Sequence, residues 1–275
     1  MRTITLRDYQ FEHYEQICRL LRHNQKVLVI GPTGCGKTTI TQTVIGMATG
    51  TEYMTHAVVL APQIQIEDGF FPQEKGLQII LPAVSEDGVV VMPPVKIRRA
   101  KDGARGGWMK LRDDDSDTRN GALDTYLRAP KPVYDCVLTT HSTFYRWAKS
   151  LNYDLKGRVL FVDEGHHAGD STELGKAIKK WLKRRGKVVF ITATAFRSAR
   201  DGVFDNILAR VVRTMAEHAR DGIYAPRDFR LSNYNLSMEA TNFEEAQGRS
   251  LPLDPALSAE EIAAKWGDAA GNTRD

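Results

Sequence analysis

Cysteine is scarce in this sequence, and long apolar runs are missing. The three cysteines, Cys18, Cys35 and Cys136, are too few and too scattered over 275 residues for a disulfide framework or a zinc site. Residues 1–5 (MRTIT) hold no apolar signal core. No apolar run approaches the roughly 20 residues needed to cross a bilayer. These absences predict a protein of the reducing cytoplasm that does not enter membranes.

Internal repeats and low-complexity tracts are absent too, which argues against repeat and disordered architectures. Hydrophobic residues make up 42% of the chain and charged residues 26%, as in ordinary globular proteins. The net charge of +4 is uneven, because residues 238–275 carry eight acids and three bases and leave an excess of nine positive charges on the rest. A basic body suits a polyanionic partner, although a solubilising surface explains the charge equally well.

Short β-branched runs alternate with helical stretches along most of the chain. The predicted strands are Lys26–Ile30, Ala57–Ala61, Tyr134–Thr139, Arg158–Val162 and Lys187–Thr192. The predicted helices are Tyr9–His23, Lys37–Met47, Ser142–Ser150 and Ser171–Arg185. Runs that are apolar on both faces fit a mostly parallel sheet with helices on each side. The sequence therefore predicts an α/β fold of three layers.

Two segments break this pattern. Residues 93–132 contain few apolar residues, several glycines and a run of aspartates, and they predict a surface insertion of about that extent. After residue 236 the chain turns acidic, and a late helix is predicted at 258–267.

Residues 31–38 (GPTGCGKT) match the pattern G-x-x-x-x-G-K-[ST], between a predicted strand and a predicted helix. Glycines let backbone N–H groups converge on phosphate oxygens, and the helix N-terminus adds partial positive charge. Lys37 would bridge the β- and γ-phosphates, and the hydroxyl of Thr38 would bind Mg²⁺. The alternative, a glycine-rich turn with an exposed lysine, is disfavoured by the strand and helix on either side.

An acidic pair, Asp163 and Glu164, directly follows the predicted strand Arg158–Val162. The carboxyl ends of buried parallel strands are where open α/β sheets bind ligands. Asp163 would hold Mg²⁺ through water, because Mg²⁺ loses its water shell reluctantly. Glu164 would orient and deprotonate the attacking water. Alone, such a pair is usually a solvated strand end, but a triphosphate needs a metal and the metal needs a carboxylate.

Six blocks of sequence, the loop at 31–38 among them, resemble, in order, the motifs of superfamily 2 helicases. The blocks are Leu6–Gln10 (LRDYQ, like the adenine-reading Q-motif), the loop at 31–38, Val58–Pro62 and Val137–Ser142 (VVLAP and VLTTHS, like motifs Ia and Ib), Asp163–His166 (DEGH, like the D-E-x-H box) and Ile191–Arg197 (ITATAFR, like motif three). The matches to motifs Ia and Ib are each weak individually. The resemblance covers residues 6–197 and implies the amino-terminal RecA-like, ATP-binding lobe of a ResIII-type member of the DEAD/DEAH-box class.

The resemblance implies roles at the nucleotide. Arg7 and Gln10 would read adenine, unless they only begin a helix. The phosphates would be bound by Gly31, Thr33, Gly34, Cys35, Gly36, Lys37, Thr38 and Thr39. Thr38 and Asp163 would hold Mg²⁺, and Glu164 and Lys37 would be the catalytic residues. ATP and Mg²⁺ are therefore the expected cofactors.

The resemblance also implies a face that grips nucleic acid by its phosphates. Pro62, Gln63 and Thr140 would lie on that face, although the family usually has threonine where Gln63 stands. His166, Thr192 and Thr194 would couple the two sites, unless the threonines merely cap a helix. Trp108 of the insertion is a candidate for stacking on bases, with burial against its own domain as the favoured alternative.

The domain prediction is a RecA-like lobe at 1–236 and an acidic interlobe linker or truncated tail at 237–275. Helicases of this superfamily have a second such lobe, which supplies arginines to the transferring phosphoryl group. No block after Thr194 resembles it, so we expect a fragment, a truncated gene or a split motor with its second lobe on another chain.

The predicted function is the motor lobe of an ATP-dependent helicase or translocase acting on nucleic acid, weak in ATP hydrolysis without its second lobe. DNA is favoured over RNA, because the R-x-Y-Q and D-E-G-H forms resemble DNA translocases more than D-E-A-D RNA helicases. The alternative is an ATP-regulated nucleic-acid or partner clamp without unwinding activity. A kinase is disfavoured by the helicase-like box and motif three.

Overall fold

The computed structural model describes residues 1–62, 70, 76–82, 93–101, 105–111, 116–193 and 207–222, with the backbone alone at 116–120. These residues belong to a compact unit spanning Met1–Ile223. Gln63, Thr194 and the predicted segment 237–275 with its late helix lie outside the described residues. Within the described part of the chain, no helix has the length and apolar character to cross a membrane.

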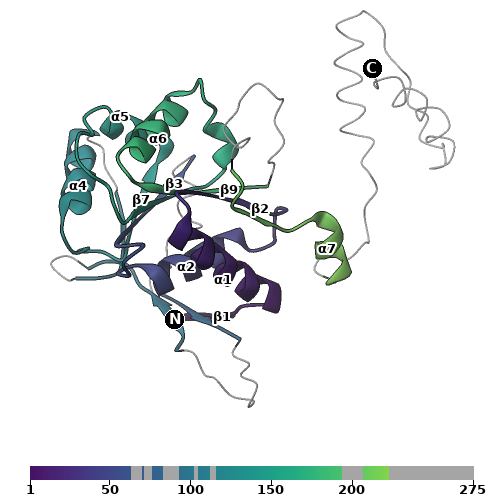
Figure 1. Ribbon diagram of the computed structural model, residues 1–275. Helices are drawn as coiled ribbons and strands as arrows, with labels where there is room; N and C mark the ends of the chain where they lie inside the picture. Colours follow the sequence, from purple (N-terminus) through teal and green to yellow (C-terminus); the bar gives the residue numbers. More distant parts are fainter. Residues whose placement is uncertain are drawn as a thin grey trace, which may run out of the picture. The chain divides into compact units, whose positions relative to one another are not determined.

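The centre of the fold is a seven-stranded sheet in which every neighbouring pair is parallel (Figure 1). In spatial order its strands are β10 (Arg210–Val212), β2 (Lys26–Ile30), β9 (Lys187–Thr192), β8 (Arg158–Val162), β3 (His56–Ala61), β7 (Cys136–Thr140) and β6 (Trp108–Lys110). β2, β8 and β9 begin and end at the predicted residues. The predicted α/β class with a mostly parallel sheet is confirmed.

Helices cover both faces of this sheet. Helices α1 (Asp8–His23) and α2 (Lys37–Ala48) lie on one face, and α4 (Ser116–Arg128), α5 (His141–Ala148) and α6 (Glu173–Lys183) lie on the other (Figure 1). Alternate residues along each strand pack into two separate hydrophobic cores, one on each face of the sheet. In β8, Val159 and Phe161 pack toward α1 and α2, whereas Leu160 and Val162 pack toward the opposite helices. This double burial explains why the strands read as continuous apolar runs.

A second sheet of three strands lies against the α1 and α2 side, and the sequence analysis missed it. β1 (Arg2–Thr5) pairs in parallel with β4 (Leu77–Ile80), which pairs antiparallel with β5 (Val95–Ile97). Contact with α2 is close, because a Cβ at Gly46 would meet Val95 Cγ1 at 2.2 Å. Strands of three or four residues carry too little periodicity to be recognised from sequence.

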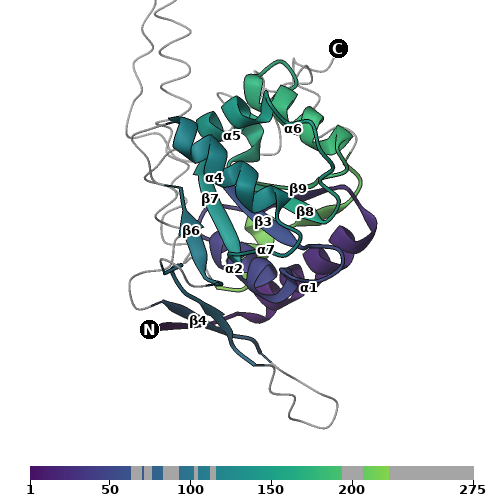
Figure 2. The ribbon, with the colours of Figure 1, turned by 90° about the vertical axis from the view of Figure 1, so that its left-hand side faces the viewer.

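The segment 93–132 is not a surface insertion where the structure describes it. It contributes β5, β6 at one edge of the main sheet (Figure 2), and α4, whose Leu123 and Leu127 are buried. Trp108 is 1% exposed, so it is a core residue and not a surface for base stacking. Gly107 has a positive φ, and a Cβ there would meet the backbone nitrogen of Ala100 at 2.8 Å, which explains the glycine at this position.

Two short elements end the described part of the chain. β10 joins the main sheet beside β2, and α7 (Met215–Arg220) follows it after a capping box between Thr214 and Glu217. Neither was predicted, because each is shorter than the windows in which apolar periodicity is readable.

His56 gives the fold a dependence on pH. Its side chain on β3 is buried, with Nδ1 3.0 Å from Thr55 Oγ1 and its ring against Tyr126. Burial, reinforced by the charge of Arg158, lowers the pKa of His56 to about 4. The unfolded chain therefore binds a proton at higher pH than the folded chain, and stability falls as pH drops from about 6.5 toward 4.

We expect the free energy of unfolding to lose on the order of 2 kcal/mol from this residue between pH 7 and 5. Urea titrations at the two pH values measure the loss, and it should be smaller by that amount in His56→Gln. The exposed His23→Gln is the matched control and should keep the wild-type pH dependence. An equal loss in His56→Gln and wild type would show that the ring is not the titrating group.

Candidate functional site

The motif residues gather at the carboxyl edge of the main sheet, where β2, β9 and β8 end side by side. Residues 31–36 leave β2 and lead into α2, whose first turn carries Lys37, Thr38 and Thr39. Gly34 and Gly36 have positive φ angles of 84° and 79°. Thr33 and Gly34 are exposed at the tip of the loop.

The loop is closely packed from beneath. A Cβ at Gly31 would meet Cys35 Sγ at 2.7 Å, and one at Gly36 would meet Gln10 Nε2 at 2.2 Å. The amide of Gly31 donates to the carbonyl of Thr192 at the end of β9 over 3.1 Å. The glycines are therefore needed for backbone shape and for close approach, and the loop is tied to the end of the neighbouring strand.

Lys37 lies folded over its own loop. Its ammonium donates to the carbonyls of Gly31 at 2.8 Å and Pro32 at 3.0 Å. The same charge acts electrostatically on Asp163, although 126 residues separate the two in sequence. The fold thus brings the lysine and the acidic pair to one site.

Asp163 and Glu164 follow β8 into a short 3-10 turn at Gly165–His167. Burial and the neighbouring charge of Glu164 raise the pKa of Asp163 to about 6, while Lys37 acts in the opposite direction. Glu164 has a φ of 48°, a left-handed backbone conformation that residues other than glycine rarely adopt. Such strain at an acidic pair is characteristic of functional sites.

His166 joins the acidic pair to the end of β9. Its Nδ1 lies 3.1 Å from Glu164 Oε2 and 3.2 Å from Thr192 Oγ1. Two of the three residues predicted to couple the sites, His166 and Thr192, are therefore in contact, and the third, Thr194, lies outside the described residues. Thr192 is fully buried and ends its strand, and its hydroxyl bonds His166.

The donor set at this edge fits Mg²⁺ better than a metal held by protein alone. Within the described ranges, no group of three His, Cys, Asp or Glu residues could enclose a metal ion. The half-buried carboxylate of Asp163 and the hydroxyl of Thr38 at the start of α2 are the candidate oxygen donors. Mg²⁺ prefers one or two such ligands, with water and phosphate oxygens completing its shell.

The two residues predicted to read adenine have different surroundings. Arg7 is exposed and is the N-cap residue of α1. Gln10 is buried, with Oε1 accepting from the amide of Arg7 at 3.0 Å and Nε2 donating to the carbonyl of Cys35 at 3.3 Å. Both ends of the Gln10 amide thus serve the protein in this structure, while Arg7 keeps its side chain at the surface.

The residues predicted to grip nucleic acid are only partly described. Pro62 is half-buried just after β3. Thr140 ends β7 and caps α5, with Oγ1 accepting from the amide of Thr143 at 3.2 Å and only 7% of the residue exposed. The hydroxyl of Thr140 therefore serves the helix cap.

Sequence reasoning missed three residues around this site. His141 Nε2 donates to the carbonyl of Asp163 at 3.1 Å, and burial lowers the pKa of His141 to about 4, so the ring is neutral near pH 7. Tyr9 donates its hydroxyl to the carbonyl of Cys35 at 2.9 Å. Arg213 stacks on the Tyr9 ring. His141 and Tyr9 lie within quoted motifs, but spacing alone does not show which carbonyl they meet.

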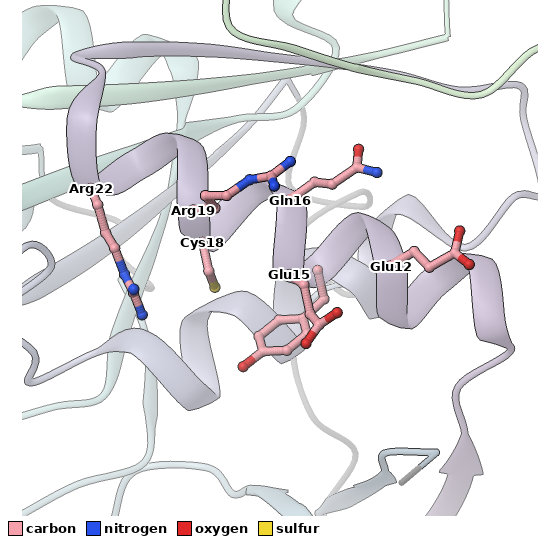
Figure 3. A pocket seen from close by; sticks show the side chains of 7 residues that line it. Glu12, Glu15, Gln16, Cys18, Arg19 and Arg22 are labelled. Carbon is pink, nitrogen blue, oxygen red and sulfur yellow. The ribbon is translucent and has the colours of Figure 1, made fainter. Parts of the chain in front are cut away.

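A cavity of about 500 Å³ opens along α1 (Figure 3). Its described lining residues are Glu12, Tyr14, Glu15, Gln16, Cys18, Arg19 and Arg22. They carry both signs of charge, and none of them is a predicted site residue. The cavity and the phosphate loop thus share no described residue.

Comparison with known proteins identifies the family. The model of the family described as "Type III restriction enzyme, res subunit" matches residues 3–197. No curated protein sequence matches the chain.

Several solved structures are similar in fold. The SWI2/SNF2 ATPase core of Sulfolobus solfataricus in complex with dsDNA is 16% identical, with a TM-score of 0.45, over 72% of this chain and 34% of that one. The Hef helicase domain of Pyrococcus furiosus is 19% identical, with a TM-score of 0.48, over 76% and 38%. The Type ISP restriction-modification enzyme LlaGI, in complex with a DNA substrate mimic, is 13% identical, with a TM-score of 0.48, over 97% and 24%.

The chain spans between 24% and 38% of the length of these three structures, and similarity this low carries no function from one protein to another. The family match covers most of the chain and contains the loop at 31–38 and the acidic pair. The chain therefore belongs to the family described as Type III restriction enzyme, res subunit, and it is an ATPase lobe of the superfamily 2 helicase and translocase type.

Proposed function

We propose that this chain binds Mg·ATP at residues 31–39 and 163–164 and serves as the motor lobe of a translocase or helicase that acts on DNA. The observation that supports this most strongly is the strand order β2–β9–β8, which puts the phosphate loop, Thr192 and the acidic pair at one edge. An electrostatic interaction between Lys37 and Asp163 across that edge supports the same assignment.

Each group at the edge has a chemical task in this proposal. Backbone amides of residues 33–38 and the N-terminus of α2 would bind phosphate oxygens, and Lys37 would exchange its two carbonyl partners for the β- and γ-phosphates. Thr38 and Asp163 would hold Mg²⁺, which when bound neutralises phosphate charge. Glu164, oriented by His166, would accept a proton from the attacking water.

Nucleic acid would be held by the phosphates, along the ends of β3 and β7. The first backbone amides of α5 suit that task better than the hydroxyl of Thr140, which caps the helix. The contact Thr192–His166–Glu164 offers a route between motif three and the water-activating carboxylate. The family description names a restriction enzyme, a class that acts on DNA, which favours DNA over RNA.

We also propose that rapid hydrolysis requires a second lobe. Arginines supplied to the phosphoryl group in other P-loop enzymes raise turnover by about 10³- to 10⁵-fold. Arg213, a buried arginine whose amide bonds Ile30 just before the loop, is already engaged with Tyr9, His218 and Asp221.

We expect the purified chain to bind Mg·ATP but to release phosphate slowly, with little stimulation by DNA. Calorimetric titration with Mg·ATP and a phosphate-release assay with and without DNA measure the two properties. Robust DNA-stimulated turnover by residues 1–275 alone would refute the requirement for a second lobe. Failure to bind Mg·ATP would overturn the proposed function itself. With the second lobe supplied, a strand-displacement assay separates a motor from a clamp that only binds.

A further inference from the structure

An arginine buried between β10 and α7 contacts residues of both α7 and α1. Arg213 is 7% exposed, and its guanidinium lies 3.6 Å from the centroid of the Tyr9 ring. Its Nε donates to His218 Nδ1 at 3.2 Å, and its terminal nitrogen pairs with Asp221. Both partners follow it within one short stretch of chain, so Arg213 fixes α7 against the lobe.

Tyr9 connects Arg213 and His218 to the phosphate loop. Its ring packs edge-on against His218 and lies under the Arg213 guanidinium, and the residue is 8% exposed. Its hydroxyl donates to the carbonyl of Cys35, the same oxygen that accepts from Gln10. Because Cys35 precedes Gly36 and Lys37, this bond helps to set the direction in which the following amides point.

A second connection runs through the backbone. The amide of Arg213 donates to the carbonyl of Ile30 at 2.9 Å, and Ile30 is the residue immediately before the loop. The chain is therefore held just before the loop, at Ile30, and within it, at Cys35, by one arginine and its stacking partner. α7 precedes the part of the chain, residues 223–275, that the structure does not describe.

We propose that Tyr9 and Arg213 are positioning residues that couple the place of α7 to the conformation of the phosphate loop. Nucleotide binding then tightens α7, and displacement of α7 loosens the loop, because coupling between two sites is reciprocal. This inference deepens the proposed function and rests on it for the nucleotide. The contacts of Tyr9 and Arg213 with the loop exist without ligand and are testable separately.

Hydrogen–deuterium exchange on the whole chain tests the ligand-free part first. Tyr9→Phe removes only the hydroxyl and keeps the ring beneath Arg213. Loss of one hydrogen bond should speed exchange of amides in 31–38 by about 5-fold, with little change in thermal midpoint. Tyr145→Phe, on the half-buried face of α5, is the matched control and should leave the loop unchanged. Unchanged exchange in Tyr9→Phe would overturn the positioning role of the hydroxyl.

The second arm asks whether the two ends are coupled. In wild type, Mg²⁺ with the non-hydrolysable analogue AMP-PNP should slow exchange both in 31–38 and in 207–222. Asp221→Asn weakens the ion pair with Arg213 without removing the arginine, so α7 is held less firmly. The protection that AMP-PNP gives to the amides of 31–38 should therefore fall by about 5-fold. Arg220→Gln, exposed on the same helix, is the control. Arg213→Gln serves as the stronger variant if it folds.

The outcomes separate this inference from the proposed function. If AMP-PNP protects 31–38 but exchange in 207–222 is the same with and without it, the coupling is refuted and nucleotide binding stands. If AMP-PNP protects nothing in wild type, the proposed function fails, and the ligand-free comparison of Tyr9→Phe with wild type still decides whether Tyr9 positions the loop. A cluster that only anchors α7 would lower stability and leave the loop's exchange unchanged.

Discussion

Replacing Lys37 with alanine is expected to raise the Kd for Mg·ATP at least about 100-fold, because two charge-assisted bonds to phosphate are lost together. Calorimetric titration or displacement of a fluorescent nucleotide measures the change. In the ligand-free chain the ammonium bonds the carbonyls of Gly31 and Pro32, so the thermal midpoint is recorded in parallel. A folded variant that no longer binds identifies Lys37 as a ligand for phosphate.

Lys176→Ala is the matched control for this experiment. Lys176 lies exposed on α6 and pairs with Glu173, so its removal takes the same charge from the chain without touching the phosphate loop. It should bind Mg·ATP as wild type does. Equal affinity in Lys37→Ala and wild type would remove the basis for the nucleotide site.

Replacing Glu164 with glutamine is expected to preserve Mg·ATP binding and to slow hydrolysis by about 100- to 10,000-fold, the usual contribution of a general base. The amide keeps the shape of the side chain and a partner for His166 Nδ1, which lies 3.1 Å from Glu164 Oε2 in wild type. It cannot accept the proton of the attacking water. Single-turnover phosphate release, with affinity measured on the same sample, separates the two effects.

Glu173→Gln provides the comparison, because Glu173 is an exposed carboxylate on α6 that pairs with Lys176 and is not among the predicted site residues. Its hydrolysis rate should match that of wild type. Wild-type hydrolysis in Glu164→Gln would mean that another group takes the proton, and the assignment of Glu164 as base would be wrong.

Much of the main sheet was predictable because each central strand is buried on both faces. Lys26–Ile30, Arg158–Val162 and Lys187–Thr192 read as unbroken apolar runs, and they form β2, β8 and β9 with the predicted bounds. The phosphate loop was predictable because the whole pattern lies within eight consecutive residues, and its glycines are required by the shape of that backbone. Local pattern alone did not join Asp163 and Glu164 to that loop; the resemblance to superfamily 2 helicases did, and the strand order β2–β9–β8 brings the two segments to one edge.

The elements that escaped prediction depend on distant contacts. Segment 93–132 is rich in glycine and charge, yet it forms β5, β6 and α4, because β7 offers β6 an edge to pair with. The surroundings of Gln10 escaped as well, because its amide meets Cys35 across 25 residues. Arg213 could not be recognised at all, since its partner Tyr9 is more than 200 residues away in sequence.

The alternation of the two cores along each strand limits how this chain can vary in length. Val162 belongs to the core beneath α5 and α6, and Asp163 is the next residue. One residue inserted into β8 would exchange its two faces and carry the carboxylate about 3.3 Å further along the strand. Insertions and deletions among related sequences should therefore fall between the strands, because a single shift in β8 would damage the core and the catalytic edge together.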